Sequence, residues 1–131
     1  KSTFHSTPVI IWDNLIKHIP FEKNKVVPVI NTENTILTDK PYCFATELTT
    51  SKYKPYFYKK TIIVADTTNE PSHLNYMIYI DHDELPSIGQ WKKINNKTFI
   101  HSLDPTIDKA IFQITKKDPL LYYKICEIHY Q

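Results

Sequence analysis

The sequence of 131 residues contains one glycine, Gly89, and no arginine. A single glycine excludes a P-loop and a dinucleotide-binding fingerprint, because both need several glycines to bring the backbone close to phosphate. Without arginine, the 16 basic residues are all lysine and offer point charges rather than a planar fork for guanine or carboxylate. The apolar runs, such as the four residues 9–12, are far shorter than the ~20 residues of a membrane-spanning helix, so we expect no membrane segment.

What is present is typical of one folded domain. Hydrophobic residues make up 41% of the chain and charged residues 23%, which argues against a disordered segment. We expect a single domain over 1–131, with an N-terminal extension and helix at 1–20 and a β-barrel at 21–131. The formal net charge of +2 is too small to indicate a dedicated polyanion-binding protein. Cys43 and Cys126 lie in strand-like segments and are expected to be reduced core thiols, with a disulfide as the alternative.

The secondary-structure pattern changes after the first 20 residues. Helical spacing of apolar residues predicts a short amphipathic helix over 10–18, carried by Trp12, Leu15, Ile16 and Ile19. Alternating or β-branched runs then predict strands at 42–49, 61–65, 74–80, 98–103, 109–115 and 120–130, with an edge or connecting strand at 26–30. Residues 83–91 are expected to contain at most a turn of helix. The pattern predicts a mainly β fold, a small five-stranded OB-like barrel preceded by the short helix.

No catalytic or metal-binding pattern is evident in the sequence. None of the six histidines forms a His-x-x-x-His pair. The cluster Asp81-His82-Asp83-Glu84 lies at a strand end, where consecutive side chains point to opposite sides and do not converge on one cation. His5-Ser6-Thr7 matches only half of the paired signature of two-histidine phosphoesterases. We therefore expect a non-catalytic protein without a metal or other cofactor.

The strand–turn–strand around Asp66 resembles strands 2 and 3 of an OB-fold. An apolar strand ends in Asp66-Thr67-Thr68, an alternating strand follows, and Asp83-Glu84-Leu85 leads to Trp91. With the leading helix around Trp12 and the final strand at 120–130, the pattern resembles one OB-fold family. That family contains the telomerase-recruiting shelterin subunit (the adrenocortical dysplasia protein homologue) and the yeast Ever Shorter Telomeres subunit.

The resemblance implies a nuclear, non-catalytic subunit of a telomere or telomerase complex that contacts the reverse transcriptase or a scaffold subunit. In this family the contact is made by the leading helix and by an acidic patch after strand 3. The residues that the resemblance assigns to partner binding are Trp12, Leu15, Ile16, Asp83, Glu84, Trp91 and Lys92. The segment after Trp91 is basic here, so Asp83 and Glu84 are the residues that stand in for the acidic patch.

Two alternatives from other classes stay open. A single-stranded nucleic-acid binder on the same fold needs aromatic side chains along a positive groove. One stretch meets that description: Lys52, Tyr53, Lys54, Tyr56, Phe57, Tyr58, Lys59 and Lys60. The other alternative is a secreted or viral β-sandwich that binds a host protein and is held by a Cys43–Cys126 bridge, with which the sequon Asn96-Lys97-Thr98 is consistent.

Overall fold

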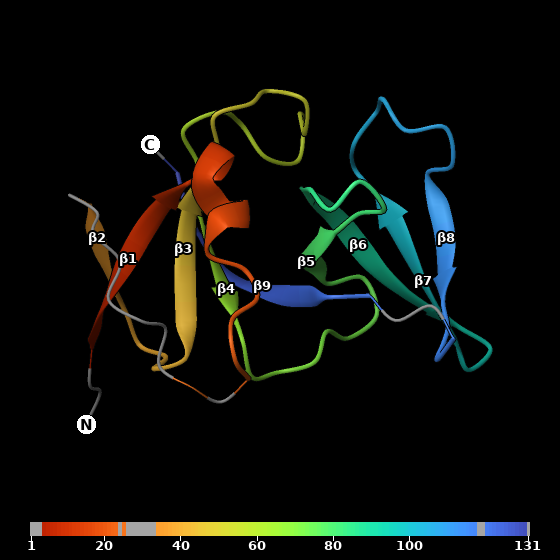
Figure 1. Ribbon diagram of the computed structural model, residues 1–131, viewed down its shortest axis with the longest axis horizontal. Coiled ribbons are helices and arrows are strands. Elements are labelled where there is room, and N and C mark those ends of the chain that lie inside the picture. Colours follow the sequence, from red (N-terminus) through yellow and green to blue (C-terminus); the bar gives the residue numbers. More distant parts are fainter. Residues whose placement is uncertain (1–3, 24, 26–33, 118–119, 131) are drawn as a thin grey trace.

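The computed structural model describes residues 4–23, 25, 34–117 and 120–130, and in this part of the chain the protein is mainly β (Figure 1). The strands are β1 (His5–Ile11), β2 (Thr35–Thr38), β3 (Cys43–Glu47), β4 (Ile62–Asp66), β5 (Tyr76–Ile80), β6 (Pro86–Ile94), β7 (Lys97–Ser102), β8 (Ile111–Ile114) and β9 (Tyr122–His129). These nine described strands form one sheet in the order β2-β1-β3-β4-β9-β5-β6-β7-β8. The sheet begins at β2 and ends at β8, so the expected five-stranded closed barrel is not formed.

The predicted helix over 10–18 is also wrong. β1 continues to Ile11 and is followed by a 3-10 helix, η1, of six residues (Trp12–Lys17). Residues 9–11 are β-branched and pair in parallel with residues 45–47 of β3, and this sheet pairing replaces the first turns of the expected helix. The apolar spacing of Trp12 and Leu15 survives in η1, where both side chains are buried.

The expected strands at 42–49, 61–65, 74–80, 98–103, 109–115 and 120–130 are each present, and β7 pairs antiparallel with β8. Within residues 83–91, expected to contain at most a turn of helix, residues 83–85 lie in the turn before β6 and residues 86–91 instead belong to this nine-residue strand. β6 pairs antiparallel with both β5 and β7, so its backbone is satisfied on both sides despite a sequence rich in turn residues. The predicted strand at 26–30 lies outside the described residues.

β9 joins two halves of the sheet. Its residues 124–129 pair antiparallel with β4, and its residues 122–124 pair antiparallel with β5. The first half of the sheet, β1 to β4, therefore lies on one side of β9 and the second half, β5 to β8, on the other (Figure 1). A register shift between Val64 and Ala65 marks a bulge within the part of β9 that pairs with β4.

Three buried apolar clusters cover the faces of this sheet. The large core draws on both halves and on η1; its members include Phe44, Tyr53, Phe57, Ile63, Ile78 and Tyr123. A second cluster covers the opposite face of the first half: Val9, Cys43, Ala45, Ile62 and Val64. A third belongs to the second half: Met77, Tyr79, Trp91 and Ile100. No helix among the described residues is long and apolar enough to cross a membrane.

Both cysteines are free thiols, so the bridge required by the secreted or viral alternative is not formed. Cys43 is buried, and its hydrogen bond with Cys126, together with burial, raises the pKa of its thiol. The Cys126 thiol also donates to the Val64 carbonyl at 3.5 Å. A protonated, buried Cys43 behaves as a small core residue rather than as a nucleophile.

Candidate docking groove

A groove of about 650 Å³ opens where η1, the β5–β6 turn and the β7–β8 loop come together. Its apolar walls are Trp12, Ile16, Leu85, Pro86 and Ile107. Its charged walls are Asp13, Lys52, Asp81, Asp83, Asp104 and Asp108. The groove therefore combines apolar walls with charged walls on which carboxylates outnumber the single ammonium group.

η1 brings Trp12 and Ile16 to the groove. The Trp12 ring is held edge to face against the buried ring of Tyr53, with 5.9 Å between the ring centroids. Asp13 accepts a hydrogen bond at its Oδ1 from the Thr49 hydroxyl at 3.0 Å, which ties η1 to the segment after β3. A helix this short is not stable alone, so these side-chain contacts hold it in place.

Asp81 organises the β5–β6 turn that forms the second wall. Its Oδ1 accepts hydrogen bonds from the backbone N–H of Asp83 at 2.9 Å and of Leu85 at 3.0 Å. Its own N–H donates to the Leu85 carbonyl at 2.9 Å, and Glu84 adopts a positive φ of 60° to complete the turn. This turn leaves the Leu85 side chain 53% exposed at the groove rim.

Asp104 carries the most deeply placed charge of the groove. It is 7% exposed, and its Oδ1 accepts hydrogen bonds from the Thr106 N–H at 2.9 Å and hydroxyl at 2.6 Å. Lys52 Nζ donates to its Oδ2 at 3.0 Å. Burial opposes ionisation of Asp104, but the hydrogen bonds from Thr106 and the Lys52 ammonium outweigh it, so the pKa of Asp104 is lowered.

The groove is negative in sum, because five aspartates face one lysine among the described residues that line it. A concave surface with charges of one sign concentrates the potential and attracts groups of opposite charge. Within the described chain, no group of three or more His, Cys, Asp or Glu residues is placed to hold a metal ion. The arrangement is suited to binding a cationic segment together with an apolar side chain.

The structure brings three of the predicted partner-binding residues, Trp12, Ile16 and Asp83, to one groove, and of these the Trp12 side chain is 7% exposed and mostly packed in the large core. Glu84 lies in the same turn and is exposed, but it does not line the groove. Leu15 is fully buried in the large core, so it offers no surface to a partner.

The other two predicted residues lie away from the groove, on β6. Trp91 is 9% exposed because its ring packs against Tyr122, with centroids 4.9 Å apart, in the third cluster. Lys92 follows it and is half-buried. Neither residue contributes to the groove walls.

The predicted nucleic-acid segment is divided in the same way. Tyr53 and Phe57 are buried, and Lys52 is paired with Asp104. Burial raises the pKa of Tyr53, whose hydroxyl donates to Ser87 Oγ at 3.4 Å. Besides Lys52, which is exposed but whose ammonium group is held by Asp104, the exposed members are Lys54, Tyr56, Tyr58, Lys59 and Lys60.

No sequence pattern indicates that Asp104, Ile107 and Asp108 lie beside η1. Asp104-Pro105-Thr106 is typical of a turn in which the aspartate accepts hydrogen bonds from the residues after it, and that local signal was visible. Its position beside Trp12 depends on the tertiary structure. No protein-family model matches this chain and no curated protein is similar to it, so the site is interpreted from its geometry.

Proposed function

We propose that this protein is a non-catalytic interaction subunit that docks a partner protein in the groove between η1 and the two turns. The observation that carries the proposal is the convergence of Trp12, Ile16 and Leu85 with five aspartates in one groove. The partner segment that fits is rich in lysine or arginine and carries one large apolar side chain.

Two physical effects support this function. An apolar side chain of the partner gains about 25 cal/mol for each Å² of apolar surface removed from water, and Leu85 offers such surface at the rim. The aspartates attract the flanking cations, which speeds association and rejects acidic segments. Within the protein itself, the Lys52 ammonium group already donates to the buried Asp104, as a cation of the partner would to the other aspartates.

The sequence resemblance supplies the candidate partner, the telomerase reverse transcriptase or a scaffold subunit of a telomere complex, and with it a nuclear location. The docking surface proposed for this contact is the groove, and it does not depend on a closed barrel. The identity of the partner and the location of the groove are therefore tested separately.

Two charge reversals in one turn test the groove. Asp83→Lys places an ammonium group on the groove wall, whereas Glu84→Lys makes the same charge change one residue away, outside the wall. In a pull-down with the reverse transcriptase's N-terminal domain, we expect Asp83→Lys to weaken binding about tenfold. Glu84→Lys is expected to change binding less than threefold. Equal losses in both variants, or full retention in Asp83→Lys, contradict docking in the groove.

A peptide probe tests binding in the groove independently of the identity of the partner. The probe Lys-Lys-Leu-Lys-Lys, labelled with a fluorophore, presents one apolar side chain between cations. Binding of this peptide with the same dependence on Asp83, but no capture of the reverse transcriptase domain, retains the docking function and rejects the telomerase assignment.

A second candidate, binding of single-stranded nucleic acid, is favoured by one observation. Tyr56 and Tyr58 are each 50% exposed beside Lys54, whose Nζ lies 5.7 Å from the Tyr58 ring centroid. Stacking on such rings contributes about 1–3 kcal/mol per base. The Tyr56→Ala/Tyr58→Ala double variant should then lose binding to a labelled oligonucleotide at low salt, while Tyr130→Ala, an exposed tyrosine on another segment, should not.

A further inference from the structure

The strand β8 ends the second half of the sheet, and among the described strands only β7 lies beside it. The Ala110 carbonyl accepts a hydrogen bond from β7 at 2.7 Å. In an antiparallel strand the backbone groups of successive residues face opposite edges. Ile111 and Gln113 therefore direct their N–H and C=O groups away from β7, toward the outer edge. This edge offers the hydrogen bonds that an additional strand needs.

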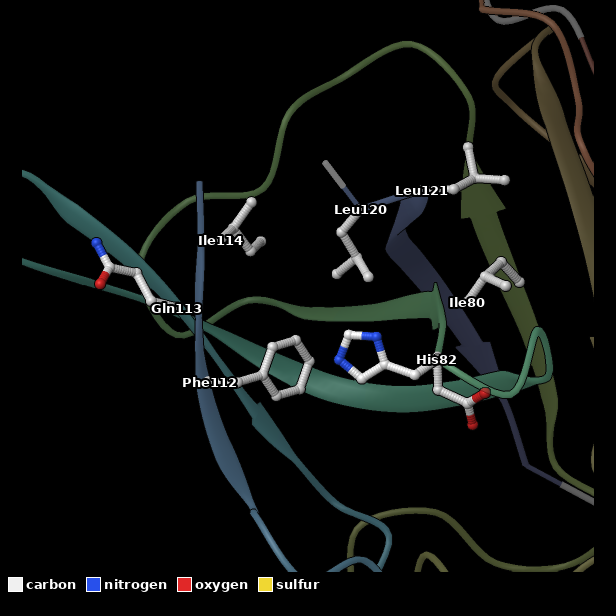
Figure 2. A pocket seen from close by; sticks show the side chains of 8 residues that line it. Ile80, His82, Phe112, Gln113, Ile114, Leu120 and Leu121 are labelled. Atoms are coloured by element: carbon white, nitrogen blue, oxygen red, sulfur yellow. The ribbon is translucent and has the colours of Figure 1, made fainter. Parts of the chain in front are cut away.

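A pocket of about 200 Å³ opens beside the same strand (Figure 2). Phe112 and Ile114 of β8 are apolar residues on one side of it, and Ile80 and Leu120 are apolar residues on the other; Asp81, His82 and Gln113 add polar groups to the lining. The His82 ring faces Phe112, with 6.3 Å between the ring centroids. The volume is below the ~300 Å³ of a typical small-molecule site and suits a single aliphatic side chain.

The charge around β8 differs between its two ends. Exposed Lys116 and Lys117 follow Ile114, and Lys97 lies at the same end on β7. Asp118, the next residue in the sequence, does not balance these three lysines. Toward the other end, a neighbouring pocket is lined by Asp83 and Lys109, and Asp81 lines both pockets. β8 itself carries no charged side chain, so these flanks decide which extended segment it accepts.

We propose that β8 binds an extended segment of a partner protein as an added antiparallel strand. One aliphatic side chain of this segment enters the pocket between Phe112 and Leu120. Acidic residues precede the apolar ones, because an antiparallel segment begins at the Ile114 end, beside Lys97 and Lys116. Main-chain hydrogen bonds to Ile111 and Gln113 supply affinity, and the pocket and lysines supply specificity.

A second copy of the chain fits this edge less well. In an antiparallel β8–β8 pair, the segment that reaches the lysine end contains Asp108 and Lys109, which bring no net negative charge. The inference does not rest on the proposed groove function, because the groove selects a basic segment and this edge selects an acidic one.

Two proline substitutions test the added strand. The probe is the capped, fluorescently labelled peptide Asp-Glu-Thr-Val-Leu-Val-Thr, and the measurement is anisotropy with the full chain. Gln113→Pro removes an outward N–H without removing a bond to β7, as proline on an edge strand permits. Leu37→Pro is the matched control on β2: the Asn34 carbonyl accepts from β1 at 3.0 Å, so Leu37 also faces outward.

We expect Gln113→Pro to weaken binding of this peptide at least tenfold and Leu37→Pro to leave it within twofold. The Lys97→Glu/Lys116→Glu variant, which leaves β8 intact, should weaken the acidic peptide at least fivefold. The same variant should strengthen the charge-reversed peptide Lys-Lys-Thr-Val-Leu-Val-Thr. Because the Lys97→Glu/Lys116→Glu variant leaves β8 intact, it tests the proposal even if a proline variant does not fold.

Three results would overturn the proposal. They are failure of the wild-type chain to bind the acidic peptide, equal binding of both peptides, and a larger loss in Leu37→Pro than in Gln113→Pro. Concentration-dependent dimerisation that Gln113→Pro abolishes, without peptide binding, would instead assign the edge to a second copy.

Discussion

The two halves of the sheet have the same strand geometry but are covered to different extents. In β4 every residue is buried, because the large core lies on one face and the second cluster on the other. In β8 exposed and half-buried residues alternate, and pockets open between it and residues 79–83 and 120–121. β9 connects the halves and shares its length between them.

This difference indicates that the positions important for the free energy of unfolding differ from the surfaces available for binding a partner. The free energy of unfolding depends most on positions that are covered from both sides, where a lost side chain leaves a cavity. Surfaces that bind partners need apolar groups that remain accessible. The second half and its junction with η1 hold accessible apolar groups, such as Leu85, in the proposed docking surfaces, and the fully covered strand β4 lies in the first half.

The strongest test of this comparison pairs two phenylalanines, one from each half. Phe44 in β3 is fully buried and contacts the rings of Phe21 and Tyr123 at centroid distances of 4.4 and 5.1 Å. Phe44→Ala should lower the free energy of unfolding by about 3–5 kcal/mol. Phe112→Ala, at a half-buried position in β8, should lower it by about 1–2 kcal/mol. Urea denaturation of both variants measures the two values, and equal losses would contradict the comparison.

Gly89→Ala tests how closely the second half is packed at its centre. A Cβ at Gly89 would lie 2.7 Å from Cγ2 of Ile100 and 3.2 Å from the His101 carbonyl oxygen. The backbone oxygen cannot move independently of the β6–β7 pairing, so we expect a loss of about 1–3 kcal/mol. Thermal and urea unfolding measure it. A neutral result would show that β6 and β7 separate easily, and that the second half is loose even at its centre.

Gly89 is also one example of why the fold was only partly predictable from the sequence. Segments such as 61–65 were predicted because β-branched residues buried on both faces form an uninterrupted apolar run. β6 was missed because Pro86, Ser87 and Gly89 are turn formers in isolation, and only the close approach of β7 gives Gly89 its role in a strand. β1 was missed because its partner β3 lies more than 30 residues away, and local spacing favoured a helix.

Asp104→Asn tests the ion pair that links the halves across the groove, since Lys52 follows β3 and Asp104 follows β7. At neutral pH we expect a loss of about 1–2 kcal/mol, because charged hydrogen bonds to Thr106 and Lys52 become neutral. The folded-state pKa of Asp104 is lowered from 3.8, so its stabilisation is complete above that pH and is lost as the pH falls below it.

The measurement for this pair is the free energy of unfolding in urea from pH 7 to pH 2. The difference between wild type and Asp104→Asn should be constant near neutrality and shrink below about pH 4. A Lys52→Met variant controls for the lysine alone. A difference that stays constant down to pH 2 would show that Asp104 does not hold a lowered pKa.

The candidate site could be predicted only for residues that a local sequence pattern identifies. Trp12 and Ile16 were selected from their spacing, and Asp83 through the family resemblance; all three reach the groove. Leu15 was selected from the same spacing as Trp12, and Trp91 as a tryptophan near the acidic segment, but they are buried in different clusters, and sequence spacing does not reveal which apolar side chain faces inward. Asp104 required knowledge of the β7–β8 loop position, which only the sheet order provides.

The smallest expected effect concerns an exception inside the well-covered half. Thr46 in β3 is fully buried, and its hydroxyl has no hydrogen-bond partner in the described part of the protein. Thr46→Val replaces this unsatisfied hydroxyl with a methyl group of similar size, so we expect a gain of up to about 1 kcal/mol in the free energy of unfolding. Ser87→Ala is the contrasting variant, because Ser87 is also buried but accepts a hydrogen bond from Tyr53. Loss of this hydrogen bond should lower the free energy of unfolding. If Thr46→Val is destabilising instead, the Thr46 hydroxyl has a partner in solution, and the first half owes part of its stability to a buried polar contact rather than to apolar coverage alone.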